Sequence, residues 1–192
     1  MSRWWWIRHG PTHARGFVGW TDLAADLSDH NRLNRLGLAL PPDALVVSSD
    51  LVRAVATADS LAEDRVRLPH ARDLREIHFG AWEGLTFAEI SERDPQLARA
   101  FWSEPGDFAP PGGESWNALT GRVSAFVDAL SATHPDRDIV AVAHLGVILS
   151  QYQRTGARSP VETLAQDIAP LSLSRFDRHA DGWEVVALNR LL

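Results

Sequence analysis

Short runs of bulky apolar residues alternate along this chain with segments of helical periodicity. Three of these runs, at 4–7, 44–47 and 138–143, predict buried strands. Apolar residues recur at helical spacing over 51–61 and, most clearly, over 116–130. A parallel crossover between two strands usually contains a helix that packs against the sheet. The alternation therefore predicts an α/β fold with a mainly parallel sheet covered on both faces.

The remaining segments are consistent with one domain built on that sheet. We expect a long loop over 12–29, a short strand within 66–74, a Pro/Gly-rich loop over 105–113, and helices over 31–40, 86–93, 95–102 and 147–154. The cluster Ser48-Ser49-Asp50 is expected to cap the helix that begins at Leu51. Two apolar stretches around the turn at 180–182 predict an antiparallel hairpin near the C-terminus. With neither a repeat nor a linker in 192 residues, we expect a single domain over 1–192.

Two missing residue types exclude several classes of chemistry. The chain has no cysteine, which excludes disulfides, thiolate catalysis and thiolate metal sites. It also has no lysine, so its 19 cationic side chains are all arginines. This excludes the Walker A loop, pyridoxal-phosphate chemistry and lysine Schiff bases.

Charge and hydropathy bear on partners and location. A net charge of -6 argues against general nucleic-acid binding, and no apolar stretch approaches the roughly 20 residues of a membrane-spanning helix. The apolar run near the N-terminus is too short for a signal peptide. We therefore expect a cytoplasmic protein with no nucleic-acid or membrane partner, and the sequence carries no indication of oligomeric state.

Residues suited to phosphate chemistry follow the predicted strands. Arg8 and His9 come directly after the first strand, Arg53 lies in the first turn of the helix after the second, and His144 follows the third. Ligands of parallel α/β sheets bind beyond the carboxyl ends of the strands, so these separate segments should meet at one place. Taken one by one, these residues would be structural histidines and ion-pair arginines. Together they predict a phosphate site, because guanidinium groups bind phosphate oxygens and a neutral imidazole can act as a nucleophile.

Phosphoryl transfer through a phosphohistidine would give each of these side chains a role. His9 would be the nucleophile. Arg8 and Arg53 would bind the phosphate oxygens and favour the neutral imidazole by repelling its protonated form. His144 would donate to the transferring phosphoryl group, helped by the N-terminus of its helix. No metal is required, because the guanidinium groups supply the positive charge.

The general acid is predicted among three glutamates in turn-rich stretches. We assign Glu76 as the group that protonates the leaving alkoxide and then takes a proton from water. Glu83 and Glu114 are the alternatives. Two tryptophans of the same stretches, Trp20 and Trp82, are either core residues or platforms for a ring-bearing substrate.

Five motifs, in order along the chain, resemble those of the histidine phosphatase superfamily in its phosphoglycerate-mutase-like branch. They are Arg8-His9-Gly10-Pro11-Thr12, Ser48-Ser49-Asp50-Leu51-Val52-Arg53-Ala54 with Thr57-Ala58, Arg75-Glu76-Ile77-His78-Phe79-Gly80 with Trp82-Glu83-Gly84, Pro111-Gly112-Gly113-Glu114-Ser115, and Ala143-His144-Leu145-Gly146-Val147. The resemblance runs from about residue 3 to 148. It implies a three-layer α/β/α sandwich, a phosphohistidine on His9, no metal or organic cofactor, and the roles given above to Arg8, Arg53, Glu76 and His144.

The chain also departs from the family pattern near the expected phosphate. Pro11 stands where the family usually has an acidic or polar residue, and Arg15 where an asparagine often contacts phosphate. Leu145 replaces a glycine that commonly follows the second histidine, and Gly19-Trp20-Thr21-Asp22 is similar to the stretch that lines the substrate entrance in the mutases. The expected phosphate- or substrate-binding residues are therefore Arg8, Arg15, Gly19, Arg53, His144 and Leu145.

The function that these features favour is hydrolysis of a phosphomonoester of a small soluble metabolite. The compact size resembles bacterial members such as α-ribazole phosphatases. One alternative is a phosphoglycerate-mutase-type phosphotransferase, although the segment from Gly84 to Pro110 is short and has only Arg93 and Arg99 as cations. The other is an inactive relative that only binds a phosphorylated ligand.

Overall fold

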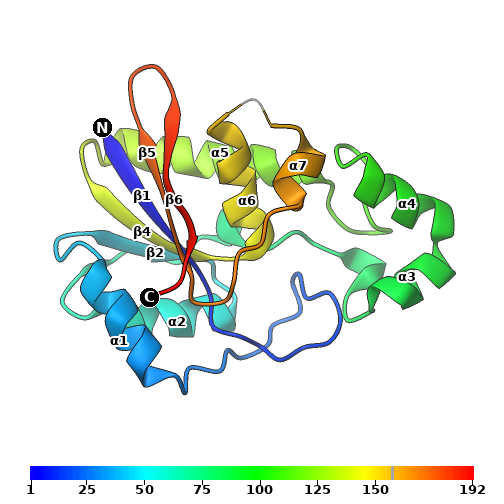
Figure 1. Ribbon diagram of the computed structural model, residues 1–192, viewed down its shortest axis with the longest axis horizontal. Helices are drawn as coiled ribbons and strands as arrows, with labels where there is room; N and C mark the ends of the chain where they lie inside the picture. The colour runs from blue at the N-terminus through cyan, green and yellow to red at the C-terminus, as the bar shows by residue number, and fades with distance from the viewer. Residues whose placement is uncertain (157) are drawn as a thin grey trace.

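A six-stranded sheet forms the centre of the computed structural model, which describes residues 1–156 and 158–192 (Figure 1). The strands are β1 (Ser2–Arg8), β2 (Leu45–Ser48), β3 (Val66–Arg67), β4 (Asp138–Ala143), β5 (Leu173–Arg178) and β6 (Trp183–Arg190), in the spatial order β3-β2-β4-β1-β5-β6. Strands β1 to β4 pair in parallel, β5 pairs antiparallel with β1, and β6 pairs antiparallel with β5. The predicted mainly parallel sheet and the C-terminal antiparallel hairpin are both confirmed.

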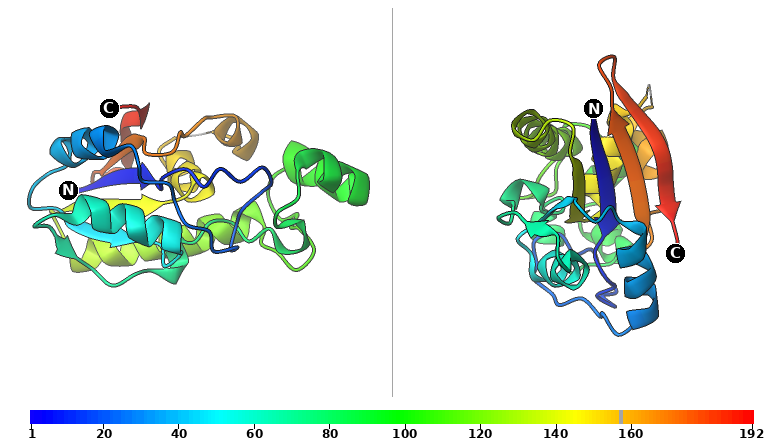
Figure 2. Two further views of the ribbon diagram at one scale, coloured as in Figure 1. Left: turned by 90° about the horizontal axis from the view of Figure 1, so that it is seen from below. Right: turned by 90° about the vertical axis from the view of Figure 1, so that its left-hand side faces the viewer.

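Helices cover both faces of this sheet. They are α1 (His30–Ala39), α2 (Val52–Ala62), α3 (Phe87–Arg93), α4 (Pro95–Ser103), α5 (Trp116–Thr133), α6 (Leu145–Arg154) and α7 (Pro160–Leu164). The apolar faces of α1 and α2 form one buried cluster with the sheet, and those of α5 and α6 belong to a second, larger cluster. The short helices α3 and α4 lie apart from the sheet, beyond the end at which α5 begins (Figures 1 and 2). The expected three-layer arrangement is confirmed.

The tryptophan run of β1 is explained by its place between the two clusters. Trp4 and Trp6 are fully buried in the larger cluster, with ring centroids 5.2 Å apart, and Trp4 donates its indole N–H to Ser131 Oγ at 3.0 Å. Ile7 is buried in the cluster of α1 and α2, and Trp5 packs against that same cluster. Successive side chains of a strand point to opposite faces, so this run anchors β1 to both layers and holds its carboxyl end in place.

Several local predictions need correction. The cluster 48–50 does not cap α2: Ser48 ends β2, and the N-cap is Leu51, whose side chain accepts no hydrogen bond. Asp22 from the long loop caps the helix instead, because its carboxylate accepts the Val52 N–H at 2.7 Å. The predicted strand within 66–74 shrinks to the two residues of β3, and the 3₁₀ helix η1 (Arg72–Leu74) follows it.

Two helices also differ from expectation. Helix α6 begins at Leu145, two residues before its predicted start, with His144 at its N-cap. Helix α7 was not predicted, since a single helical turn leaves too few apolar residues for a recognisable period. None of the described helices is both long enough and apolar enough to cross a bilayer.

Candidate active site

Two histidines lie side by side where the neighbouring strands β1 and β4 end. The strands pair in parallel with Arg8 opposite Ala143, and the His9 N–H donates to the Ala143 carbonyl at 3.0 Å. The imidazole rings of His9 and His144 have centroids 5.0 Å apart. His9 is 7% exposed and His144 is fully buried. The structure therefore brings these two predicted site residues together.

Hydrogen bonding defines the protonation state of His9. Its Nδ1 lies 2.7 Å from the Gly10 carbonyl oxygen, which can only accept, so Nδ1 carries the proton. Nε2 is then the nitrogen with a free electron pair, and the Arg53 Nε–H donates to it at 3.3 Å. Burial lowers the pKa of His9 to about 3; the Gly10 hydrogen bond opposes this shift, and the charges of Arg53 and Arg8 add to it. His9 is a neutral, oriented base at physiological pH.

Arg53 is buried and fixed by backbone carbonyls. It lies in the first turn of α2 and is 1% exposed. Its two terminal nitrogens donate to Gly19 O at 2.6 Å and to Thr21 O at 2.9 Å. One turn later, the Thr57 hydroxyl donates to Arg53 O and accepts the Gly10 N–H at 3.0 Å. Helix α2 and the loop after β1 are thereby joined around the guanidinium.

The loop that holds Arg53 is itself held by Glu83. One carboxylate accepts hydrogen bonds from the N–H groups of Gly19, Trp20 and Thr21, from the Thr21 hydroxyl, and from the Phe79 N–H. Burial alone would raise the pKa of Glu83, but these donors outweigh it and the pKa is lowered. Sequence reasoning placed Glu83 only among the candidate acids. No residue pattern along the chain identifies a carboxylate that serves a loop more than 60 positions away.

Glu76 lies buried at the start of α6. Its carboxyl oxygens accept the Gly146 N–H at 3.1 and 3.2 Å and the Ile77 N–H at 2.9 Å. A Cβ on Gly146 would come within 2.5 Å of Glu76 Oε1, so only glycine at 146 permits this approach. Burial raises the pKa of Glu76, against the hydrogen bonds and the charges of Arg53 and Arg8. The site thus contains a carboxyl group whose burial shifts its equilibrium toward the protonated form.

The backbone of Glu76 is held by hydrogen bonds from two side chains. Its carbonyl oxygen accepts the Trp20 indole N–H at 2.8 Å and an Arg122 N–H at 3.0 Å. Arg122 is also paired with Glu114 through two hydrogen bonds of 2.7 Å. Glu114, an alternative acid in the sequence, is therefore bound to an arginine that helps to hold Glu76.

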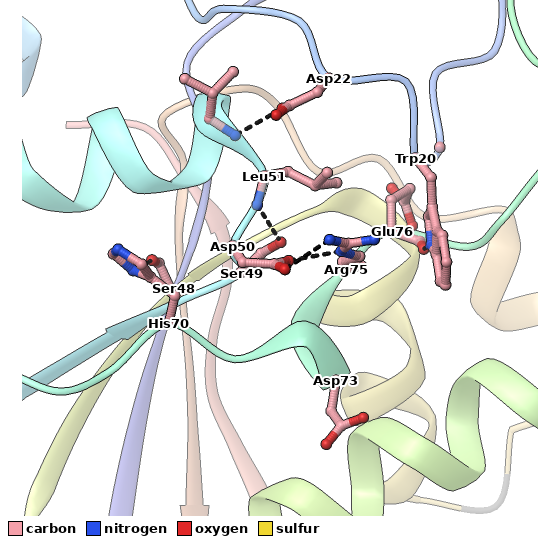
Figure 3. A network of polar contacts seen from close by, with 12 residues as sticks. Trp20, Asp22, Ser48, Ser49, Asp50, Leu51, His70, Asp73, Arg75 and Glu76 are labelled. Carbon is pink, nitrogen blue, oxygen red and sulfur yellow. Dashed lines mark hydrogen bonds and ion pairs between the residues drawn. The ribbon is translucent and has the colours of Figure 1, made fainter.

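The half-buried Trp20 ring is contacted by two arginines. Arg72 and Arg75 place their guanidinium carbons 5.2 and 4.9 Å from its ring centroid, and Arg75 forms two hydrogen bonds of 2.7 Å with Asp50 (Figure 3). Trp82 is fully buried and donates to Asp94 at 2.7 Å, so its interpretation as a stacking platform was wrong and its interpretation as core was correct. Both rings serve the protein's own packing.

Three buried nitrogens at this site have no hydrogen-bond partner within the described chain. They are both ring nitrogens of His144 and the Nε of Arg8. Burial, with the charges of His9, Arg53 and Arg8, holds the pKa of His144 well below its usual value. Arg8 is anchored at one terminal nitrogen, which donates to Ile168 O at 2.5 Å. Buried donors without partners are costly, so they indicate a site shaped for a polar ligand.

The other predicted binding residues lie at different depths. Gly19 is buried, and its N–H is taken by Glu83 while its carbonyl holds Arg53. Arg15 lies exposed in the long loop. Leu145 is half-buried in the first turn of α6, beside His144.

Comparison with known proteins identifies the family. Residues 4–191 match the family described as "Histidine phosphatase superfamily (branch 1)". The chain belongs to the histidine phosphatase superfamily. This confirms the resemblance carried by the five motifs.

The chain is similar to proteins named as enzymes and to a solved structure. The chain is 39% identical over 177 residues to "Bifunctional protein Rv2228c" of Mycobacterium tuberculosis, covering 89% of this chain but only 45% of that protein. It thus spans less than half the length of that relative. It is 38% identical over 157 residues to the glucosyl-3-phosphoglycerate phosphatase of the same organism, covering 74% of this chain and 70% of the relative. The native structure of the mycobacterial glucosyl-3-phosphoglycerate phosphatase superimposes with a TM-score of 0.84 at 29% identity, covering 99% of each chain.

Proposed function

We propose that this protein is a metal-independent phosphomonoester hydrolase that acts on a small phosphorylated metabolite through a phosphohistidine on His9. The observation that carries the proposal is the pair of neutral histidines. His9 presents a free electron pair on Nε2 beside Arg53, and His144 has two buried nitrogens without partners within the described chain. A phosphoryl group between the rings would supply an acceptor for the one N–H of neutral His144. Membership of a phosphatase family, with phosphatase-named relatives, supports the same reaction.

In the first step, His9 Nε2 attacks phosphorus and the bond from phosphorus to the ester oxygen breaks. The imidazole keeps its Nδ1 proton and becomes positively charged, and the Gly10 carbonyl stabilises that charge through the existing hydrogen bond. Arg8, Arg53 and His144 bind the phosphoryl oxygens, so guanidinium groups provide the positive charge. Glu76 gives its proton to the leaving alkoxide and becomes a carboxylate.

In the second step, water regenerates the enzyme. The Glu76 carboxylate takes a proton from water as the water oxygen attacks phosphorus, and the bond from phosphorus to His9 Nε2 breaks. Inorganic phosphate leaves, Glu76 is protonated again, and His9 returns to its neutral form. The raised pKa of Glu76 suits a group that must be protonated at the start of each cycle.

A panel of phosphomonoesters with an inorganic-phosphate readout tests this proposal. The panel includes p-nitrophenyl phosphate, α-ribazole 5′-phosphate, phosphoserine, and phosphoglycerates. We expect release of phosphate without added metal and in the presence of a chelator. Migration of phosphate between the hydroxyls of phosphoglycerate would instead identify a mutase. Failure to hydrolyse any ester, with tight binding retained, would identify an inactive phospho-ligand binder.

A further inference from the structure

An apolar pocket of about 80 Å³ is lined by Glu76 and the first residues of α6. Its walls are contributed by elements from across the chain, including Phe79, Phe101 of α4, Trp116 of α5, Leu145 of α6 and Leu164 of α7. Of the described residues that line this pocket, Glu76 alone is ionisable. The pocket therefore places an apolar surface next to the proposed acid. This surface offers no partner for a charged group on a ligand.

The arginines of the neighbouring segments are directed elsewhere. Arg93 donates to the Ala81 carbonyl at 2.9 Å and pairs with Asp94. Arg99 lines a separate groove formed by α3 and α4. Arg158 lies over the Tyr152 ring, 4.3 Å from its centroid. None of these cations is among the described residues that line the apolar pocket.

We propose that this pocket binds the uncharged, apolar part of the alcohol that leaves, so that the substrates are phosphomonoesters of neutral apolar or aromatic alcohols. The inference rests on the proposed function, because Glu76 would protonate the ester oxygen that joins phosphate to this group. A carboxylate placed here would lose its hydration without a cationic partner and would lie beside Glu76. The pocket therefore selects against alcohols that carry a carboxylate.

The size of the pocket limits the group next to the ester oxygen. A cavity of about 150 Å³ is large enough to hold benzene. The volume here is about 80 Å³, so the pocket takes a short aliphatic chain or the outer half of one aromatic ring, including the position para to the ester oxygen. The rest of a larger alcohol would extend toward solvent.

A matched pair of substrates tests the inference on the unmodified protein. Phenyl phosphate and 4-carboxyphenyl phosphate share one ring, and the carboxylate does not make the phenol a poorer leaving group. We expect kcat/KM to be about tenfold or more higher for phenyl phosphate, because only the second substrate must bring a charge into the pocket. Equal values, or a preference for the carboxylated ester, would overturn the inference while leaving the proposed hydrolase intact.

Two variants on the same short helix refine the test. Leu164→Arg places a cation at the pocket wall and should reduce the preference for phenyl phosphate at least fivefold, because the arginine can pair with the substrate carboxylate. Val161→Arg places the same charge on an exposed position of α7 that does not line the pocket, and should leave the ratio unchanged. Equal effects of the two variants would contradict the assignment of the pocket.

Phosphonate analogues separate the inference from the proposed function. Phenylphosphonate and 4-carboxyphenylphosphonate report on binding by calorimetry without turnover, and we expect tighter binding of the first by about tenfold. If neither ester is hydrolysed but phenylphosphonate binds more tightly, the hydrolase proposal fails and the pocket assignment stands. If both esters are hydrolysed but the two phosphonates bind equally, the pocket assignment fails instead.

Discussion

The phosphate end and the alcohol end of the proposed site are built from different interactions. At the phosphate end, His9 is oriented by Gly10 and Arg53 by the carbonyls of Gly19 and Thr21, whereas the ring nitrogens of His144 have no partner among the described residues. At the alcohol end, the pocket walls are apolar side chains from four helices and two loops. Recognition of a fixed charged group needs exact donor geometry, whereas an apolar group is selected by exclusion of water and charge. The first end should set the reaction, and the second the choice of substrate.

The largest expected effect comes from removing the nucleophile. His9→Ala should lower kcat about 10⁴-fold or more for all esters, because it removes the unprotonated nitrogen that Arg53 contacts. Steady-state phosphate release measures the loss. His13→Ala is the control, since His13 lies exposed in the following loop and pairs with Asp26, and it should retain activity. Substantial turnover by His9→Ala would contradict the assignment.

Removing the proposed acid should affect substrates unequally. Glu76→Gln should slow alkyl phosphates about 100-fold or more, because their alkoxides need a proton, and should slow p-nitrophenyl phosphate by less than about tenfold. Parallel kcat measurements on the two classes give the comparison. Glu114→Gln should show no such difference between classes, because Glu114 is bound to Arg122. Equal losses for Glu76→Gln on both classes would argue against its role as the acid.

The buried neutral histidines should make the fold sensitive to acid. The unfolded chain protonates each histidine near pH 6.5, whereas folded His9, with its pKa near 3, stays neutral. The contribution of neutral His9 to the free energy of unfolding should therefore be fully present above pH 6.5. It should be lost progressively as the pH is lowered toward 3. The contribution of His9 to this loss is about 2 kcal/mol at pH 5, and His144 acts in the same direction.

Urea unfolding at pH 7 and pH 5 measures this sensitivity. On going from pH 7 to pH 5, His9→Gln should lose about 2 kcal/mol less unfolding free energy than the unmodified protein. An identical loss in His9→Gln would show that His9 is not held neutral.

The smallest expected effect concerns the support of Arg53. Glu83→Gln replaces an acceptor-only carboxylate with an amide whose NH₂ group faces the backbone N–H donors of the loop. We expect kcat/KM to fall about tenfold, equally for phenyl phosphate and 4-carboxyphenyl phosphate, because the change acts at the phosphate end. Glu89→Gln, at an exposed cap of α3, should change neither value. A changed ratio of kcat/KM between the two substrates would contradict the assignment of Glu83 to the phosphate end alone.

The phosphate-end side chains could be predicted from the sequence, whereas the loop contacts that support them and the alcohol pocket could not. His9, Arg53 and His144 could be predicted because the two histidines directly follow strands, Arg53 lies in the first turn of the helix after a strand, and parallel strands end at one edge of a sheet. Glu83 and the Trp20–Glu76 contact could not, because they join loops whose conformations depend on tertiary hydrogen bonds. The pocket carried no signal either: Phe101 and Leu164 each contribute one apolar side chain to it, and in the sequence they look like ordinary core residues.

Isolation of the reaction intermediate tests the central claim most directly. Rapid acid-free quenching during turnover of p-nitrophenyl phosphate, followed by mass spectrometry of peptides under alkaline conditions, locates any covalent phosphate. We predict a phosphohistidine on His9, with the phosphoryl group on Nε2, that accumulates in Glu76→Gln and is absent from His9→Ala. A phosphoryl group on another residue, or turnover with no covalent intermediate, would contradict the account.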